Sequence, residues 1–97
     1  MAEIKRTGST LVISGELKIQ FLEELKHELE ELVRAEGQVR IDLGGVSELD
    51  MAGLQLLAAF VRSRAERGPV VLGPVSDAFR HAVRLSGLEE IFGPYWQ

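Results

Sequence analysis

The stretch VRIDLGGVSELDMAGLQLLAAFVRSRAERGPVVL, residues 39–72, contains a helix-like segment between two short strand-like ones. Val39–Leu43 alternates apolar and polar residues, which is the two-residue period of a strand. Val70–Leu72 is continuously apolar, as expected of a strand covered on both faces. Residues 51–67 have apolar residues at helical spacing, and Gly68-Pro69 ends this pattern. The stretch therefore predicts a strand, a helix and a parallel strand joined by a right-handed crossover.

The rest of the chain supplies elements of the same kinds. Leucines at three- and four-residue steps predict a helix over residues 21–35, and Ser76 is a suitable N-cap for a helix over 77–85 that Gly87 would end. The other predicted elements are a hairpin of strands 3–6 and 10–14, a connector over 16–20, a helical turn over 88–92, and a tail or edge strand over 93–97. We expect one α/β domain over residues 1–97, with a single mixed sheet of four or five strands and helices mainly on one face.

The composition excludes several classes of function. With 97 residues, 45% of them hydrophobic and 27% charged, the chain fits one soluble globular domain. The net charge of −4 argues against nucleic-acid binding, which favours a clustered basic face. The sequence has no cysteine, which excludes disulfides, thiol catalysis and thiolate metal sites. The longest apolar run, Leu56–Val61, is far too short to span a membrane, so we expect a cytoplasmic protein without direct membrane insertion.

Asp50 stands directly before the predicted helix 51–67. Its carboxylate can accept hydrogen bonds from the free amides of the first turn. Gly53, in that turn, allows another backbone to approach closely or fits a tight packing contact. The strand before this loop ends at the sheet edge that carries functional loops in open α/β sheets. The loop Gly44–Gly53 is therefore the predicted functional region.

Residues 39–93 resemble the core of a STAS domain, the fold of bacterial anti-sigma factor antagonists. The shared features are Asp-Leu at the end of a strand, Asp-x-x-Gly-Leu opening a helix (Asp50–Leu54), a Gly-Pro stop, an apolar strand and a Ser-led helix. The Leu-Ser-Gly-Leu of residues 85–88 resembles the family's closing helix, and LVISGELKI, residues 11–19, resembles its Gly-Glu-Leu segment. The resemblance covers nearly the whole chain, and the order and spacing of the motifs make it specific.

The resemblance implies a switchable protein-binding module without catalytic activity. In the family, a partner such as an anti-sigma kinase docks on the first turn of this helix and on the loop before it. In regulated members a serine or threonine directly after the Asp is phosphorylated by that kinase, and the added charge abolishes binding. Met51 occupies this phosphoacceptor position here and Ala52 follows it, so no phosphorylation is expected there. Met51 either provides an adaptable, permanently uncharged contact or packs under the loop.

The predicted contact surface is the segment around Asp50. Its residues are Ser47, Glu48, Leu49, Asp50, Met51, Ala52, Gly53, Leu54 and Gln55. Leu54, like Leu57, is also a candidate core residue. The hydroxyl of Ser47 is a substitute phosphoacceptor in one interpretation, and in the simpler one it shapes a turn.

Other polar and aromatic residues give weaker signals. His27 and His81 lack a third ligand at metal spacing, and neither Gly-x-Ser-x-Gly nor a phosphate loop is present, so no metal, cofactor or catalytic site is predicted. Arg62, Arg64 and Arg67 are expected to pair with the negative end of their own helix, with an acidic partner or lipid surface as the alternative. Tyr95 and Trp96 either fold back on the core or form part of an interface.

Two functions follow from the resemblance. The preferred one is an anti-sigma factor antagonist-like protein in sigma-factor regulation or chemotaxis-type partner switching, with a kinase-fold or other regulatory protein as partner. The alternative is the small STAS subunit of a bacterial phospholipid-transporting ABC system, in which the same helix face contacts the ATPase subunit and a threonine usually follows the Asp. The sequence leaves the partner, the pathway and the oligomeric state open.

Overall fold

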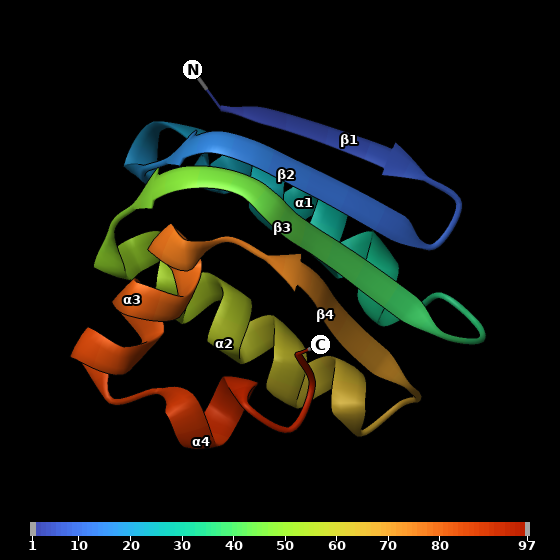
Figure 1. Cartoon of the computed structure of the whole chain (residues 1–97). Helices are drawn as coiled ribbons and strands as arrows, with labels where there is room; N and C mark the ends of the chain where they lie inside the picture. The colour runs from blue at the N-terminus through green and yellow to red at the C-terminus, as the bar shows by residue number, and fades with distance from the viewer. Residues whose placement is uncertain (1, 97) are drawn as a thin grey trace.

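A computed structural model describes residues 2–96 of the chain (Figure 1). Strands and helices alternate after an N-terminal hairpin, as predicted. The elements are β1 (Glu3–Thr7), β2 (Thr10–Leu17), a 3-10 turn (Ile19–Phe21), α1 (Leu22–Val33), β3 (Val39–Leu49), α2 (Met51–Ala65), β4 (Val70–Val75), α3 (Asp77–Ser86) and α4 (Glu89–Phe92).

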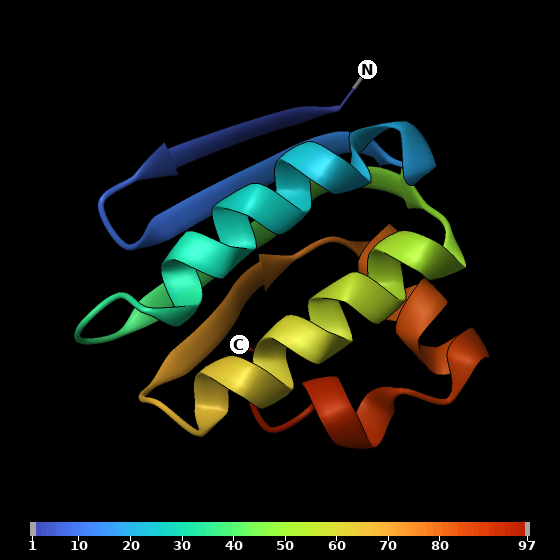
Figure 2. The same cartoon turned by 180° about the vertical axis from the view of Figure 1, so that it is seen from behind.

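The strands form one four-stranded mixed sheet in the order β1-β2-β3-β4. β1 pairs antiparallel with β2, while β2 with β3 and β3 with β4 are parallel. The two parallel pairs are joined by α1 and α2, which lie side by side on the same face of the sheet (Figure 2). This confirms the predicted α/β class and the mixed sheet.

Three strands continue beyond their predicted ends and past the glycines that follow those ends. β3 runs through Gly44-Gly45 to Leu49, β2 runs through Gly15 to Leu17, and β4 runs through Gly73 to Val75. The pairing of β2 with β3 shifts register near Gly15 and near Gly44-Gly45. It then resumes, with Leu17 opposite Leu49. A bulge or irregularity absorbs a glycine without ending the strand, so the shorter boundaries were wrong.

One continuous hydrophobic cluster fills the space between the sheet and the helices. α1 contributes Leu25, Leu29 and Leu32, and α2 contributes Leu54, Leu57 and Val61, all of them buried. The C-terminal segment also joins this core. Trp96 forms a bridge with Leu72 of β4 and an edge-to-face contact with Phe79. The tail therefore folds back along the sheet edge, and the sheet itself has four strands rather than five.

Arg64 corrects the prediction for the arginine cluster. Its side chain is 1% exposed and binds the end of α1 rather than of its own helix. Nη1 donates to the carbonyl oxygens of Val33 at 3.1 Å and Ala35 at 2.6 Å, and Nη2 donates to that of Gly37. A Cβ at position 68 would lie 2.8 Å from Nη2, so this arrangement requires Gly68. Arg64 thus ties the C-terminal ends of α1 and α2 together.

Replacing Arg64 by Met should destabilise the fold by about 2–4 kcal/mol, because it leaves part-buried carbonyl oxygens at the end of α1 without their donor. Urea unfolding followed by circular dichroism measures the change. Arg62 is exposed on the same helix, so Arg62→Met is the matched control and should cost less than about 0.5 kcal/mol. Equal losses of stability in the two variants would show that Arg64 does not hold the ends of α1 and α2 together.

Candidate functional site

The Asp50 carboxylate connects two turns of the chain at one end of the sheet. Oδ1 accepts a hydrogen bond from the Gly53 amide at 3.0 Å, which makes Asp50 the predicted N-cap of α2. Oδ2 accepts a hydrogen bond from the amide of Ile19 at 3.1 Å. The Asp50 amide in turn donates to the Leu17 carbonyl oxygen at 3.2 Å. The start of α2 is therefore fixed both to its own first turn and to the connector after β2.

Gly53 is buried where α2 crosses the end of β2. A Cβ at this position would lie 3.2 Å from the carbonyl oxygen of Leu17 and 3.3 Å from its Cγ. Those separations are tighter than ordinary van der Waals contacts. Of the two roles predicted for Gly53, close packing within the chain is the one that the structure supports.

Exposed apolar side chains gather around this end of α2. Among residues 2–96, the large hydrophobic side chains that are exposed are Val12, Ile19, Met51 and Leu85, at 36%, 66%, 50% and 76%. The last three lie near Asp50. The backbone amide of Ile19 donates a hydrogen bond to the Asp50 carboxylate, and Met51 and Leu85 line one cavity together with Asp50. Exposed apolar side chains that lie together, rather than singly, are typical of a contact surface.

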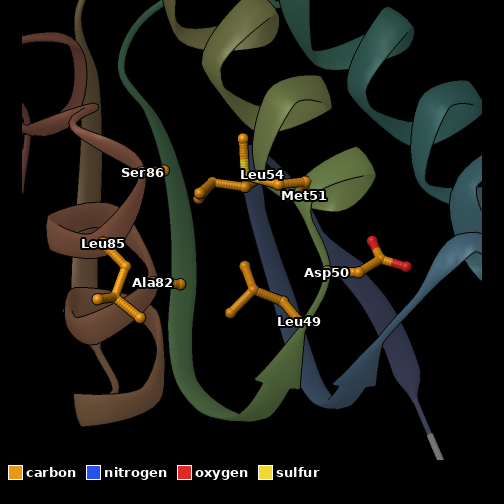
Figure 3. A pocket seen from close by; sticks show the side chains of 7 residues that line it. All are labelled: Leu49, Asp50, Met51, Leu54, Ala82, Leu85 and Ser86. Atoms are coloured by element: carbon orange, nitrogen blue, oxygen red, sulfur yellow. The ribbon is translucent and has the colours of Figure 1, made fainter.

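A groove separates the first turn of α2 from α3 (Figure 3). On one side are Met51 and Leu54, on the other Ala82 and Leu85, and Leu49 forms part of the floor. This part of the groove has a volume of about 300 Å³. An adjoining hollow of about 270 Å³ shares Leu49, Ala82 and Leu85 and extends toward Ser47 and His81. We call the two together the α2–α3 groove.

Charged residues border the groove at the ends of β2 and β3. Glu16 and Glu48 are directly opposite each other in the β2–β3 register. Like charges in that position repel, and Lys18 lies between them, with Nζ 3.8 Å from Glu16 and 3.5 Å from Glu48. The apolar groove is thus flanked by a small, mostly exposed ion-pair network.

The predicted contact residues fall into two sets. Ser47, Glu48, Met51 and Gln55 are exposed, and Leu49, Asp50 and Ala52 are half-buried. Gly53 and Leu54 are buried, and Leu57 is fully buried, so the candidate core role of the two leucines holds. Met51 does not pack under a loop, because half of its surface is exposed.

Sequence reasoning missed the α3 side of the groove. Phe79 and Val83 define the buried face of α3, and Leu85 lies off that face. A leucine on the solvent side of a short amphipathic helix was the available signal. What places it opposite Met51 is tertiary packing, which no local pattern encodes.

In the described part of the chain, no group of three or more His, Cys, Asp or Glu side chains could hold a metal ion. His27 and His81 are exposed on different helices. Within residues 2–96, no helix is both long and apolar enough to cross a membrane. The arrangement at the groove offers apolar surface and hydrogen-bonding groups, which is the chemistry of recognition.

The protein is thus a small α/β domain with exposed apolar side chains near the N-terminus of α2. The family model described as "Mlab, STAS domain" matches residues 1–93. The chain therefore belongs to the STAS domain family, as its sequence motifs suggested. A search of curated proteins found no matching relative.

Solved structures of anti-sigma factor antagonists share the fold. The phosphorylated form of the Bacillus cell fate determinant SpoIIAA is 23% identical, with a TM-score of 0.69 and coverage of 100% of this chain and 89% of that one. A putative anti-sigma factor antagonist from Thermotoga maritima is 16% identical, with a TM-score of 0.72 and coverage of 98% and 84%. An anti-sigma factor antagonist from Mycobacterium paratuberculosis is 25% identical, with a TM-score of 0.65 and coverage of 99% and 84%.

Replacing Asp50 by Ala should destabilise the protein by about 1–2 kcal/mol, because the first turn of α2 loses its cap and the Ile19 amide loses its acceptor. Asp50→Asn keeps one side-chain oxygen and should lose less. Urea denaturation midpoints of the three proteins test the order. A midpoint for Asp50→Ala equal to that of the wild type would show that the carboxylate does not hold this junction.

Replacing Leu54 by Ala should cost roughly 2–5 kcal/mol of stability, because the side chain is buried beneath the groove and its removal leaves a cavity. Thermal unfolding gives the change. Leu56 is only half-buried on the same helix, so Leu56→Ala is the control and should lower the melting temperature less. An unchanged melting temperature for Leu54→Ala would contradict its assignment to the core.

Proposed function

We propose that this chain is a non-catalytic, cytoplasmic protein-binding module that works as an anti-sigma factor antagonist-like regulator. Residues 1–97 act as one domain, and the contact surface is formed by Ser47–Gln55 together with the α3 side of the α2–α3 groove. The observation that carries the proposal is the half-exposed Met51 on the first turn of α2, directly after the capping Asp50.

The geometry around Asp50 supports a preformed docking surface. Each carboxylate oxygen accepts one hydrogen bond within the chain, so Asp50 positions the first turn of α2. Met51 and Leu85 are then held on opposite sides of the groove by separate helices. A partner that covers both buries apolar surface without ordering a loop first, which lowers the entropic cost of binding.

The nature of residue 51 supports constitutive rather than switched binding. SpoIIAA has been solved in phosphorylated and unphosphorylated forms, so that relative carries a phosphate in one state. If the phosphate of regulated family members falls on the residue after the Asp, this chain has Met51 there and Ala52 next, neither of which has a hydroxyl. Without that added charge, the docking surface keeps one state.

A second function is favoured by the family model itself, whose description names Mlab. In this alternative the chain is the small STAS subunit of a bacterial phospholipid-transporting ABC system. The same surface would then contact an ATPase subunit rather than an anti-sigma kinase. The two functions share the docking surface and differ in the partner.

Replacing Met51 by Glu should weaken partner binding at least about tenfold, equivalent to about 1.4 kcal/mol, because it puts a charge into the apolar contact. Tagged wild-type and variant proteins are used to capture partners from native lysate, and the affinity for the identified partner is then measured by calorimetry. A captured kinase-fold protein supports the first function, and a captured ATPase supports the second.

Ala59→Glu is the matched control, since Ala59 is exposed on the same helix about two turns from Met51. This variant should bind as the wild type does. If Met51→Glu and the wild type capture the same partner with equal affinity, docking occurs on another surface and the site assignment is wrong.

A further inference from the structure

The guanidinium of Arg64 is a buried cation without an acidic partner. Within residues 2–96, no carboxylate lies within salt-bridge distance of Arg64, and its Nε is buried with no hydrogen-bond partner. The only compensation comes from three carbonyl oxygens at the end of α1 and the partial negative charge of that helix end. A buried charge is costly unless a counter-charge accompanies it.

A polar cavity of about 350 Å³ adjoins this guanidinium. Its lining residues belong mainly to the loop after α1 and the loop after α2. Both loops lie at the opposite end of α2 from Asp50 (Figure 2). Arg34 and Arg67 also line it, and both are exposed. In the described part of the chain neither has a carboxylate within salt-bridge distance. Three arginines thus line one cavity: Arg34 at the C-cap of α1, Arg64 in α2 and Arg67 in the loop after α2.

The carbonyl oxygens nearby would not repel an anion strongly. Those of Val33, Ala35 and Gly37 accept hydrogen bonds from Arg64. The Arg64 carbonyl oxygen accepts from the amides of Arg67 at 2.9 Å and Gly68 at 3.0 Å. With these acceptors occupied, the arginines dominate the field in the cavity. The exposed carboxylate of Glu36 is the one opposing charge among the lining residues.

We propose that this cavity binds a phosphate-type oxyanion, either free phosphate or the phosphate group of an ester. Arg34 and Arg67 grip its oxygens from two sides, since a guanidinium matches phosphate geometry with paired N–H donors. Arg64, which is buried beside the cavity, adds positive charge, and the anion supplies the counter-charge that Arg64 lacks. The cavity volume is at the small end for ligand pockets, which suits a phosphate group with little attached to it.

The site is independent of the docking surface. The 15 residues of α2 separate the two by about 22 Å at the helical rise of 1.5 Å per residue. Loss of phosphate binding would therefore leave the proposed docking function standing, and the reverse also holds.

The test is a titration of the full chain with sodium phosphate at constant ionic strength, followed by the amide resonances of Gly37 and Gly68 in nuclear magnetic resonance. These resonances should shift in a saturable way. The double variant Arg34→Gln/Arg67→Gln should raise the dissociation constant at least about tenfold, because both directly binding groups are removed. Both residues are exposed, so the variant keeps the fold, which its circular dichroism spectrum checks.

Two further variants separate a built site from general attraction of anions. Arg62 is exposed on α2 but does not line the cavity, so Arg62→Gln should leave the dissociation constant unchanged. Glu36→Gln removes the opposing charge and should lower it. The proposal is overturned by shifts that do not saturate, or by an equal loss of affinity in Arg62→Gln and the double variant.

The source of the phosphate is distinguished with the same proteins. Glycerol 3-phosphate represents a soluble ester, and phosphatidylcholine vesicles containing phosphatidic acid represent a lipid headgroup. Sedimentation of the wild type but not of the double variant with the vesicles would identify a headgroup. Saturable binding of glycerol 3-phosphate alone would identify a small soluble ester, and binding of neither ester would restrict the site to free phosphate.

Discussion

The N-cap hydrogen bonds of Asp50 are the constraint on which this structure depends most. One carboxylate joins the amide of Gly53 in α2 to the amide of Ile19 after β2, two segments that are far apart in the sequence. This fixes where α2 begins relative to the sheet, and the close contact of Gly53 with Leu17 follows from that position. Met51, directly after the cap, is half-exposed on the first turn of α2.

The other end of α2 is held by a different interaction of the same kind. Arg64 donates to the last carbonyl oxygens of α1, so the two crossover helices are joined where both end. Each end of α2 thus has one polar side chain that satisfies backbone groups of a neighbouring segment, and apolar packing fills the length between them. Such hydrogen bonds fix the position of α2 as well as stabilising it, since a misplaced helix would leave backbone groups unpaired.

The sequence predicted the elements well because their patterns are local, and it failed where pairing or packing decides. The leucine periods located α1 and α2, and Ser76 and Gly87 located the ends of α3, where Ser76 accepts from the Phe79 amide at 3.0 Å. Strand ends at Gly15 and Gly44-Gly45 were wrong because inter-strand bonds resume beyond them. The burial of Arg64 had a local signal: with Leu57 and Val61 it follows the helical period of the buried face. The α3 side of the groove had only a weak sequence signal, the position of Leu85 off the apolar face of α3. Leu85 and Met51 line the same groove only because of the tertiary fold.

If docking occurs as proposed, a methionine at position 51 changes what the same scaffold can regulate. A phosphoacceptor makes the surface bistable, because one modification adds nearly two negative charges to an otherwise apolar contact. Because Met51 and Ala52 have no hydroxyl, we infer that no phosphate is added to the proposed docking surface at these two positions, and that its occupancy there depends on partner concentration and affinity. Control of the interaction must then come from the partner's abundance, from changes in the partner, or from a ligand bound elsewhere on this chain that alters α2 as a whole.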